Sequence, residues 1–165
     1  MTCVAECPSF PLSLYAWTNA TCVEICPIGY MNDFNRSCVG SCPYLIDPTT
    51  NRCVSMCPFS SINNTLLYAN MLTFTCVSAQ MCPNNTYASD DLLECVSTCP
   101  NGTFIHQKNC VKFCPNGFYI NPLAQTCVTA RNCPTSYFAN NQTHSCVLAC
   151  TNGTFGDSLT KTCLT

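Results

Sequence analysis

The feature that most constrains this chain is a ladder of paired cysteines. In every complete pair Val follows the first cysteine, and Pro follows the second in every pair except the one ending Cys150-Thr151. Successive pairs begin 15 to 23 residues apart, a spacing typical of short structural repeats. The complete pairs are Cys3/Cys7, Cys22/Cys26, Cys38/Cys42, Cys53/Cys57, Cys76/Cys82, Cys95/Cys99, Cys110/Cys114, Cys127/Cys133 and Cys146/Cys150, and Cys163 begins another. The sequence therefore predicts an array of small repeats built on the motif Cys-Val-x-x-Cys-Pro.

The density of cysteine indicates the compartment. Nineteen of the 165 residues are cysteine, above the roughly 8–10% that marks the disulfide scaffolds of secreted proteins. So many bridges persist only in oxidising surroundings. We therefore expect an extracellular or cell-surface protein.

Charged residues are scarce and scattered. They make up 8% of the chain, with a net charge of −2, whereas about 25% is usual in a soluble domain. The chain has no basic stripe for nucleic-acid phosphates and no run of about 18 apolar residues. We therefore expect neither a nucleic-acid partner nor a membrane segment in this chain. Because Met1-Thr2-Cys3 leads straight into a repeat, without a signal-peptide pattern, we expect an upstream segment to be missing.

A longer period is superimposed on the short one. Seven pairs have three residues between their cysteines, but Cys76/Cys82 and Cys127/Cys133 have five and begin 51 residues apart. Three short repeats would then form one larger unit. The predicted divisions are 1–21, a partial first repeat with an apolar loop; 22–75, a triplet with a long loop at 58–75; 76–126, a triplet; and 127–165, an incomplete triplet.

Each cysteine is expected to bond outside its own pair. Residues four positions apart on an extended strand are about 13 Å apart, at about 3.3 Å per residue, whereas a disulfide needs about 4.4–6.8 Å between Cα atoms. The simplest scheme bonds the second cysteine of one pair forward to the first cysteine of the next: Cys7–Cys22, Cys26–Cys38, Cys42–Cys53, Cys57–Cys76, Cys82–Cys95, Cys99–Cys110, Cys114–Cys127, Cys133–Cys146 and Cys150–Cys163. Cys3 is left unpaired within the chain, as in a fragment of a longer array or an intermolecular bond. An interleaved scheme, with Cys3–Cys22 and Cys7–Cys26, remains open.

The residues around the cysteines predict β structure. Val after the first cysteine, Pro after the second and an occasional Gly soon afterwards indicate a short strand, a turn and another short strand. No segment shows a useful helical period. A module of about 17 residues is too small for a core of its own. The predicted fold is a set of small disulfide-rich repeats forming an elongated rod of short strand pairs and turns, with very little helix and no single globular core.

Two segments show the fullest form of the motif, Cys-Val-x-x-Cys-Pro-x-Gly followed by Phe or Tyr, namely 22–30 and 110–119. This signature resembles the furin-like, growth-factor-receptor cysteine-rich repeats, and similar arrays occur in large surface proteins of protists. The resemblance covers almost the whole chain. It implies single-disulfide modules bonded forward and stacked as rods of short strand pairs. In that family such modules serve as spacers, dimerisation arms or surface coats, so the fold transfers better than the function.

Two loops, 8–21 and 58–75, are longer than their neighbours and rich in apolar residues. The second lies in a stretch from Cys53 to Ser89 that has no charged residue. A thin rod has little interior, and contiguous exposed apolar area marks contact sites. We therefore expect a protein–protein interface, most plausibly between copies of this chain; the alternative is that each loop folds over its own module. The candidate interface residues are Phe10, Leu12, Leu14, Tyr15, Trp17, Leu66, Leu67, Tyr68, Met71, Leu72 and Phe74.

Glycosylation sequons are the other recurrent feature. Seven occur, about twice the number expected by chance for this composition. Sugars would give a charge-poor chain the polar surface it lacks; the alternative is that Asn and Thr are common turn residues here. The expected N-glycosylation sites are Asn19, Asn35, Asn63, Asn84, Asn101, Asn141 and Asn152.

Catalytic and metal sites are not indicated. His106 and His144 have no nucleophile or carboxylate at a recognisable motif spacing, and both are expected to be exposed turn residues. Asp90, Asp91 and Glu94 lack the ligand pattern of a calcium loop, and the regular cysteine ladder favours disulfides over zinc. We expect no enzymatic activity, no cofactor apart from covalent N-linked glycans, and no small-molecule ligand.

Two functions therefore remain. The first is an extracellular structural protein, a glycosylated rod-like part of a surface coat, appendage or filament that associates with other copies of itself. The alternative is a receptor-like or adhesive ectodomain that binds a protein or sugar ligand. Self-association would distinguish them.

Overall fold

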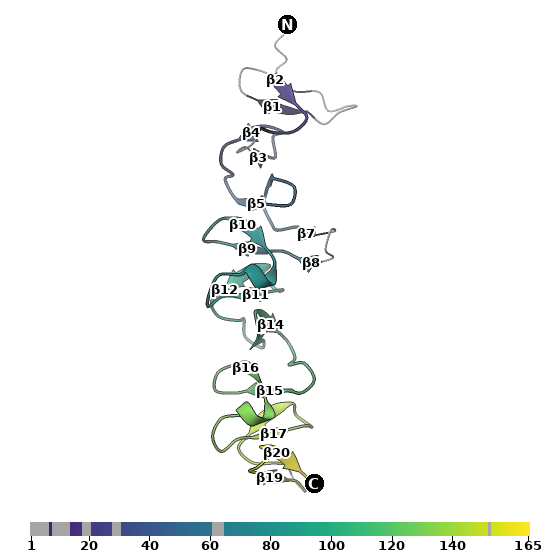
Figure 1. Cartoon of the computed structure of the whole chain (residues 1–165), viewed down its shortest axis with the longest axis vertical. Helices are drawn as coiled ribbons and strands as arrows, with labels where there is room; N and C mark the ends of the chain where they lie inside the picture. The colour runs from purple at the N-terminus through teal and green to yellow at the C-terminus, as the bar shows by residue number, and fades with distance from the viewer. Residues whose placement is uncertain (1–6, 8–13, 18–20, 28–30, 61–64, 152) are drawn as a thin grey trace. The chain divides into compact units, whose positions relative to one another are not determined.

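The computed structural model describes residues 7, 14–17, 21–27, 31–60, 65–151 and 153–165. The chain divides into two compact units. Unit 1 comprises Met1–Pro83 and Asp90–Cys95, and unit 2 comprises Asn84–Ser89 and Val96–Thr165. Within each unit the chain forms successive two-stranded β-hairpins (Figure 1). The expectation of small, disulfide-rich β repeats is confirmed.

The hairpins are short, with strands of two to four residues. Each has an apolar or aromatic residue early in its first strand, and eight of the ten described hairpins have the Cys-Val of the motif in the second; the exceptions are 59–66, without a cysteine, and 155–164, with Cys163-Leu164. In unit 1 the strands are β1 (Tyr15–Trp17), β2 (Thr21–Val23), β3 (Met31–Asn32), β4 (Cys38–Val39), β5 (Leu45–Asp47), β6 (Arg52–Val54), β7 (Phe59–Ser60), β8 (Thr65–Leu66), β9 (Tyr68–Asn70) and β10 (Thr75–Val77). Most of β12 (Glu94–Val96) also belongs to this unit.

Unit 2 repeats the same construction. Its strands are β11 (Tyr87–Ser89), β13 (Phe104–His106), β14 (Asn109–Val111), β15 (Phe118–Asn121), β16 (Thr126–Thr129), β17 (Phe138–Asn140), β18 (Ser145–Val147), β19 (Phe155–Asp157) and β20 (Thr162–Leu164). The two strands of each hairpin pair antiparallel, as in β17–β18, where Ala139 lies opposite Cys146. The first strand of each hairpin pairs in parallel with the second strand of the next, as in Ala139 with Thr162.

Nine disulfides hold the hairpins. Their Cα atoms lie 5.4 to 5.7 Å apart. Each bond joins the second cysteine of one pair to the first cysteine of the next pair, which lies in the second strand of a hairpin. The nine disulfides are therefore those of the forward scheme. Cys3 lies outside the described residues.

A repeated backbone hydrogen bond connects consecutive hairpins. In each case an N–H from the first strand of one hairpin donates to a carbonyl in the tip of the next, at 2.7 to 3.1 Å. All but one of these carbonyls belong to a residue in the left-handed conformation, with φ between 49° and 59°. That conformation costs a non-glycine residue about 1–2 kcal/mol, and here it aims the carbonyl at the preceding hairpin. The donor–acceptor pairs are Ala16–Arg36, Asn32–Asn51, Ile46–Phe74, Ala69–Leu93, Ala88–Lys108, Ile105–Gln125, Ile120–His144 and Ala139–Lys161, with Lys108 the exception in conformation.

An Asn or Asp closes five of the ten described hairpin tips in the same way. It ends the first strand, six residues before the Cys-Val cysteine, and its side-chain oxygen accepts the backbone N–H two residues further on. This Asx turn holds the four-residue tip in place before the left-handed residue. The acceptor–donor pairs are Asp47–Thr49, Asn70–Leu72, Asn121–Leu123, Asn140–Gln142 and Asp157–Leu159.

The two cysteine pairs with five-residue spacing have a structural cause. Each contains one turn of 3-10 helix, η2 (Ala79–Met81) and η3 (Ala130–Asn132), which accommodates the two additional residues. These turns are the only helical segments of the described residues. None of the described helices therefore has the length and apolarity needed to cross a membrane.

The core consists of small clusters beneath the hairpins. In unit 1 the disulfide Cys57–Cys76 packs with Leu45, Leu67 and Ala69. In unit 2 the disulfide Cys133–Cys146 packs with Ala139, which is fully buried. The absence of a single large core is consistent with stability that depends on each module and its neighbours.

The tip of β5–β6 makes stability depend on pH. Burial alone would raise the pKa of the Asp47 carboxyl, but hydrogen bonds from the side chains and backbones of Thr49 and Thr50 outweigh burial and lower the pKa. The ionised Asp47 carboxylate therefore stabilises the fold at pH values above the pKa of Asp in an unfolded chain, about 3.9. This stabilisation is lost as the pH falls through the lower pKa that Asp47 has in the folded protein. Asp47→Ala should lower the free energy of unfolding by about 2 kcal/mol at pH 7, measured by urea denaturation.

Asp47→Asn is the matched control for this prediction. Asn occupies the equivalent position at Asn70 and Asn121 and accepts the same N–H, so the turn should be kept while the titrating group is lost. The difference in stability between wild type and this variant should shrink from pH 7 to pH 3. A difference that stays constant with pH would contradict the role of the ionised carboxylate.

Candidate functional site

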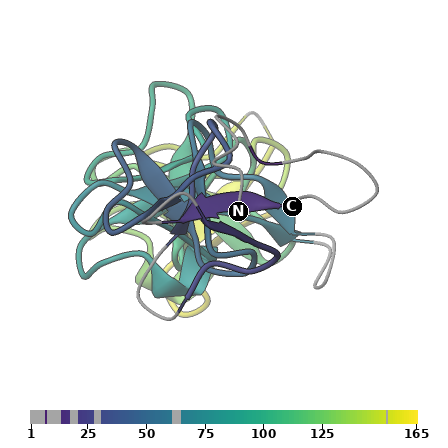
Figure 2. The same ribbon diagram turned by 90° about the horizontal axis from the view of Figure 1, so that it is seen from above.

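The charge-free stretch from Cys53 to Ser89 contains the second group of candidate interface residues, which runs from Leu66 to Phe74. The segment that was expected to be one long loop forms two adjacent hairpins of unit 1 (Figure 1). In β7–β8, Phe59 lies opposite Leu66. The β9–β10 hairpin follows directly, and the ribbon of β7–β8 lies to one side of it (Figures 1 and 2). Sequence analysis did not predict β7–β8, because its strands have only two residues each.

The tip of β9–β10 presents apolar side chains to solvent. Met71, Leu72 and Phe74, here called the β9–β10 tip, are 52%, 79% and 51% exposed. The Asn70 side chain accepts the Leu72 N–H at 3.0 Å, and Phe74 has a left-handed backbone with φ of 53°. The turn geometry therefore fixes these side chains outside the core. An exposed apolar group that is already ordered loses little entropy when a partner covers it.

Two hollows border these hairpins. One, of about 190 Å³, lies beside the β9–β10 tip and is lined by Pro43, Tyr44, Leu45, Ser55, Ala69, Met71, Phe74 and Glu94. The other, of about 450 Å³, lies beside β7–β8 and is lined by Phe59, Thr65, Leu66, Tyr68, Ser78, Ala79 and Gln80. Leu66 is 37% exposed at this second hollow. The apolar surface is therefore recessed as well as projecting, which suits an interlocking partner.

Three of the candidate interface residues belong instead to the interior. Tyr15, Leu67 and Tyr68 are all buried, and Leu67 packs with the Cys57–Cys76 disulfide. The burial of these three residues fits the alternative expectation, in which each loop folds over its own module. Tyr68 also donates its hydroxyl proton to Asp90 Oδ1 at 2.6 Å, which ties β9 to the next tip of unit 1.

The first apolar loop is described only in part. Leu14 is half-buried, and its carbonyl accepts a hydrogen bond from Arg36. Trp17 ends β1, but its side chain is not described. Phe10 and Leu12 lie outside the described residues. The interface hypothesis therefore rests on the β9–β10 tip and Leu66.

The described sequon asparagines are all exposed. They are Asn35, Asn84, Asn101 and Asn141, whereas Asn19, Asn63 and Asn152 lie outside the described residues. Asn141 accepts a hydrogen bond from the Tyr119 hydroxyl through its side-chain oxygen. A glycan would be attached to the side-chain nitrogen, so this contact does not occupy the modified atom.

The polar residues considered for catalysis or metal binding have structural positions. His106 lies in β13, half-buried, and its ring packs edge-on against Phe118 at 4.7 Å between centroids, so its expected place in an exposed turn is wrong. His144 is the exposed left-handed residue of its tip. In the described part of the chain no three His, Cys, Asp or Glu side chains are grouped to hold a metal ion.

The sequence contains a signal for the exposed tips that its analysis missed. An Asn or Asp followed two residues later by Leu occurs in the tips at 70–72, 121–123 and 157–159. In each case the leucine N–H closes the Asx turn and its side chain is 70% exposed or more. The motif combines a turn residue with a solvent-facing apolar group.

Comparison with known proteins assigns no relative. No family model matches this chain, and no curated protein matches it significantly. The disulfide-rich repeat structure itself fits an extracellular structural protein or an ectodomain.

Tyr68 provides a test of the buried assignment. Burial, then the hydrogen bond to Asp90 and the charge of Asp90, raise the pKa of the Tyr68 phenol far above its ordinary value. The neutral Tyr68 phenol therefore stabilises the fold at pH values below the pKa of tyrosine in an unfolded chain, about 10. This stabilisation is lost only as the pH rises above that value. An ultraviolet titration should show a tyrosine that ionises only as the protein unfolds in alkali. Tyr68→Phe should abolish this late ionisation and lower the free energy of unfolding by about 1 kcal/mol.

Tyr44→Phe is the control, because Tyr44 is 57% exposed beside the β9–β10 tip. It should leave the late-ionising group in place. If Tyr68→Phe leaves the late ionisation unchanged, Tyr68 is accessible and the assignment to the core is wrong.

Proposed function

We propose that this chain is part of an extracellular, glycosylated structural protein of the furin-like repeat type, which associates with copies of itself in a surface coat, appendage or filament. In this proposal the repeats supply stiffness and spacing, glycans supply solubility, and the β9–β10 tip supplies the contact. We also propose that the chain has no enzymatic activity and needs no cofactor.

The exposed β9–β10 tip is the observation that carries the proposal. Its three apolar side chains lie within 37 residues of uncharged sequence, so a partner that covers them meets few charges, with Glu94 charged at the hollow beside the tip. Covering an exposed Leu or Met side chain contributes about 1.5–3 kcal/mol. The 190 Å³ hollow beside the tip offers a recess for an apolar side chain of the second copy.

The repeat construction supports a structural role. In the described part of the chain the disulfides recur in the same way, each closing onto the second strand of a hairpin, and a backbone hydrogen bond recurs between successive disulfide-closed hairpins. Such a frame can be lengthened by adding modules without a new core. Its regularity favours a role in which length and surface matter more than a single cleft.

Self-association can be tested at the β9–β10 tip. Replacing both Met71 and Leu72 by Ser should weaken association by about tenfold or more, since burial of these two side chains would be lost. Sedimentation velocity over a concentration series of the oxidised chain measures this change. Because both residues are exposed in the tip, the variant should keep the wild-type unfolding transition.

Leu159→Ser is the matched control. Leu159 occupies the same place in its Asx turn and is 88% exposed, but its tip is bounded by Asp157 and Lys161 rather than by apolar residues. It should leave association unchanged. A wild-type chain that stays monomeric at every concentration, or an equal loss with Leu159→Ser, would contradict the proposal and favour the receptor-like ectodomain.

Glycosylation gives a separate prediction. Material made in a eukaryotic secretory host should lose mass on treatment with an N-glycosidase, and Asn84→Gln or Asn101→Gln should each remove one glycan. Both asparagines are exposed. Asn85→Gln is the control, because Asn85 is the exposed neighbour of Asn84 but not a sequon. An unchanged mass after treatment would contradict the glycan part of the proposal alone.

A further inference from the structure

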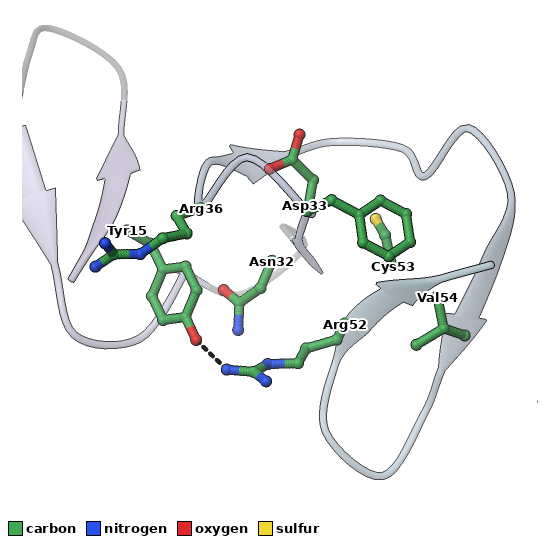
Figure 3. Close-up of a pocket in the computed structure, with 8 residues that line it drawn as sticks. Tyr15, Asn32, Asp33, Arg36, Arg52, Cys53 and Val54 are labelled. Carbon is green, nitrogen blue, oxygen red and sulfur yellow. Dashed lines mark hydrogen bonds between the residues drawn. The ribbon is translucent and has the colours of Figure 1, made fainter. Parts of the chain in front are cut away.

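A polar pocket of about 370 Å³ lies at the start of unit 1 (Figure 3). Residues from three consecutive hairpins, β1–β2, β3–β4 and β5–β6, form its walls. The volume is in the range of small-ligand sites. The lining residues are Tyr15, Asn32, Asp33, Phe34, Arg36, Arg52, Cys53 and Val54.

A tyrosine–arginine pair lies at the centre of this pocket. Arg52 Nη2 donates a hydrogen bond to the Tyr15 hydroxyl (Figure 3). The Arg52 guanidinium carbon also lies 5.8 Å from the centroid of the Tyr15 ring. Both interactions hold the guanidinium beside the pocket, and Tyr15 itself is buried. The guanidinium has five N–H donors, so most of them remain for another acceptor.

This pair departs from the pattern of the other hairpins. Tyr68 and Tyr119 each donate their hydroxyl proton to an Asp or Asn 22 residues further along the chain. The Tyr15 hydroxyl instead accepts a hydrogen bond from Arg52, 37 residues further along. Among the described residues, none accepts a hydrogen bond from the Tyr15 hydroxyl, so this hydroxyl can donate into the pocket. Two kinds of donor, a phenol and a guanidinium, therefore meet at one point.

The nearby charges leave this point electropositive. Asp33 Oδ1 accepts the backbone N–H groups of Asn35 and Ser37, each at 2.9 Å, so its carboxylate is used in the turn. Figure 3 shows the Asp33 carboxylate directed away from the Arg52 guanidinium. Within the described residues, both side-chain contacts of Arg52 are with Tyr15, and neither is with a carboxylate.

We propose that this pocket binds the carboxylate of an acidic sugar. A guanidinium matches a carboxylate with two parallel N–H donors, and the Tyr15 hydroxyl would donate a third hydrogen bond. The Phe34 ring and Val54 provide apolar surface on which a pyranose ring can pack. The volume of the pocket suits one sugar unit, either free or at the end of a glycan. This ligand is additional to the structural role and does not depend on self-association.

The test is isothermal titration calorimetry of the full oxidised chain with glucuronate, with glucose as the neutral analogue and acetate as the carboxylate without a ring. Glucuronate should bind most tightly, acetate more weakly, and glucose without measurable heat. Arg52→Gln should weaken glucuronate binding by about tenfold or more, as expected for loss of a charge-assisted contact. Tyr15→Phe keeps the ring and should weaken binding less.

Arg131→Gln is the control for charge, because Arg131 is an exposed arginine in unit 2. It should leave glucuronate binding unchanged. Equal binding of glucose and glucuronate, no binding of either, or unaltered binding by Arg52→Gln with a wild-type unfolding transition would overturn the proposal. A glycan ending in glucuronate that binds more tightly than the free sugar would identify the glycan as the source of the ligand.

Discussion

The forward disulfide is the constraint on which the rest of this structure depends. A hairpin with strands of two to four residues buries too little apolar surface to be stable alone. Here one covalent bond fixes the start of each hairpin against its second strand, with Cα atoms 5.4 to 5.7 Å apart. A bridge over a loop of this size stabilises by about 2–4 kcal/mol. Each hairpin therefore needs only a small core cluster, and side chains of its tip can serve at the surface.

The disulfide orders a hairpin, but the hydrogen bond between tips joins one hairpin to the next. The left-handed residue costs energy within its own tip and gives its carbonyl to the neighbouring strand. A tip is consequently most stable when its neighbour is folded, which couples adjacent modules. The side chains of the exposed leucines and aromatic residues of the tips take no part in this backbone bond, so they can vary from repeat to repeat without disturbing the frame.

The frame could be predicted from sequence far better than the surface. Cysteine spacing, Val and Pro predicted hairpins and one consistent pairing scheme, because those residues have the same role in each repeat. The left-handed positions could not be predicted, since residues as different as Arg, Phe, Leu, Gln and Lys occupy them alongside Asn and His. The burial of Leu67 and Tyr68 was missed because their segment was interpreted as a loop, whereas four successive residues, Leu67 to Asn70, are buried.

The Tyr15–Arg52 pocket shows why a site in a repeat protein is hard to find in its sequence. Its central residues are 37 positions apart and belong to hairpins separated by a third. A periodic motif describes what the repeats share, whereas this pocket contains a Tyr15–Arg52 contact that differs from the contacts of Tyr68 and Tyr119. Specific binding in such an array is therefore expected where a repeat departs from its own rule.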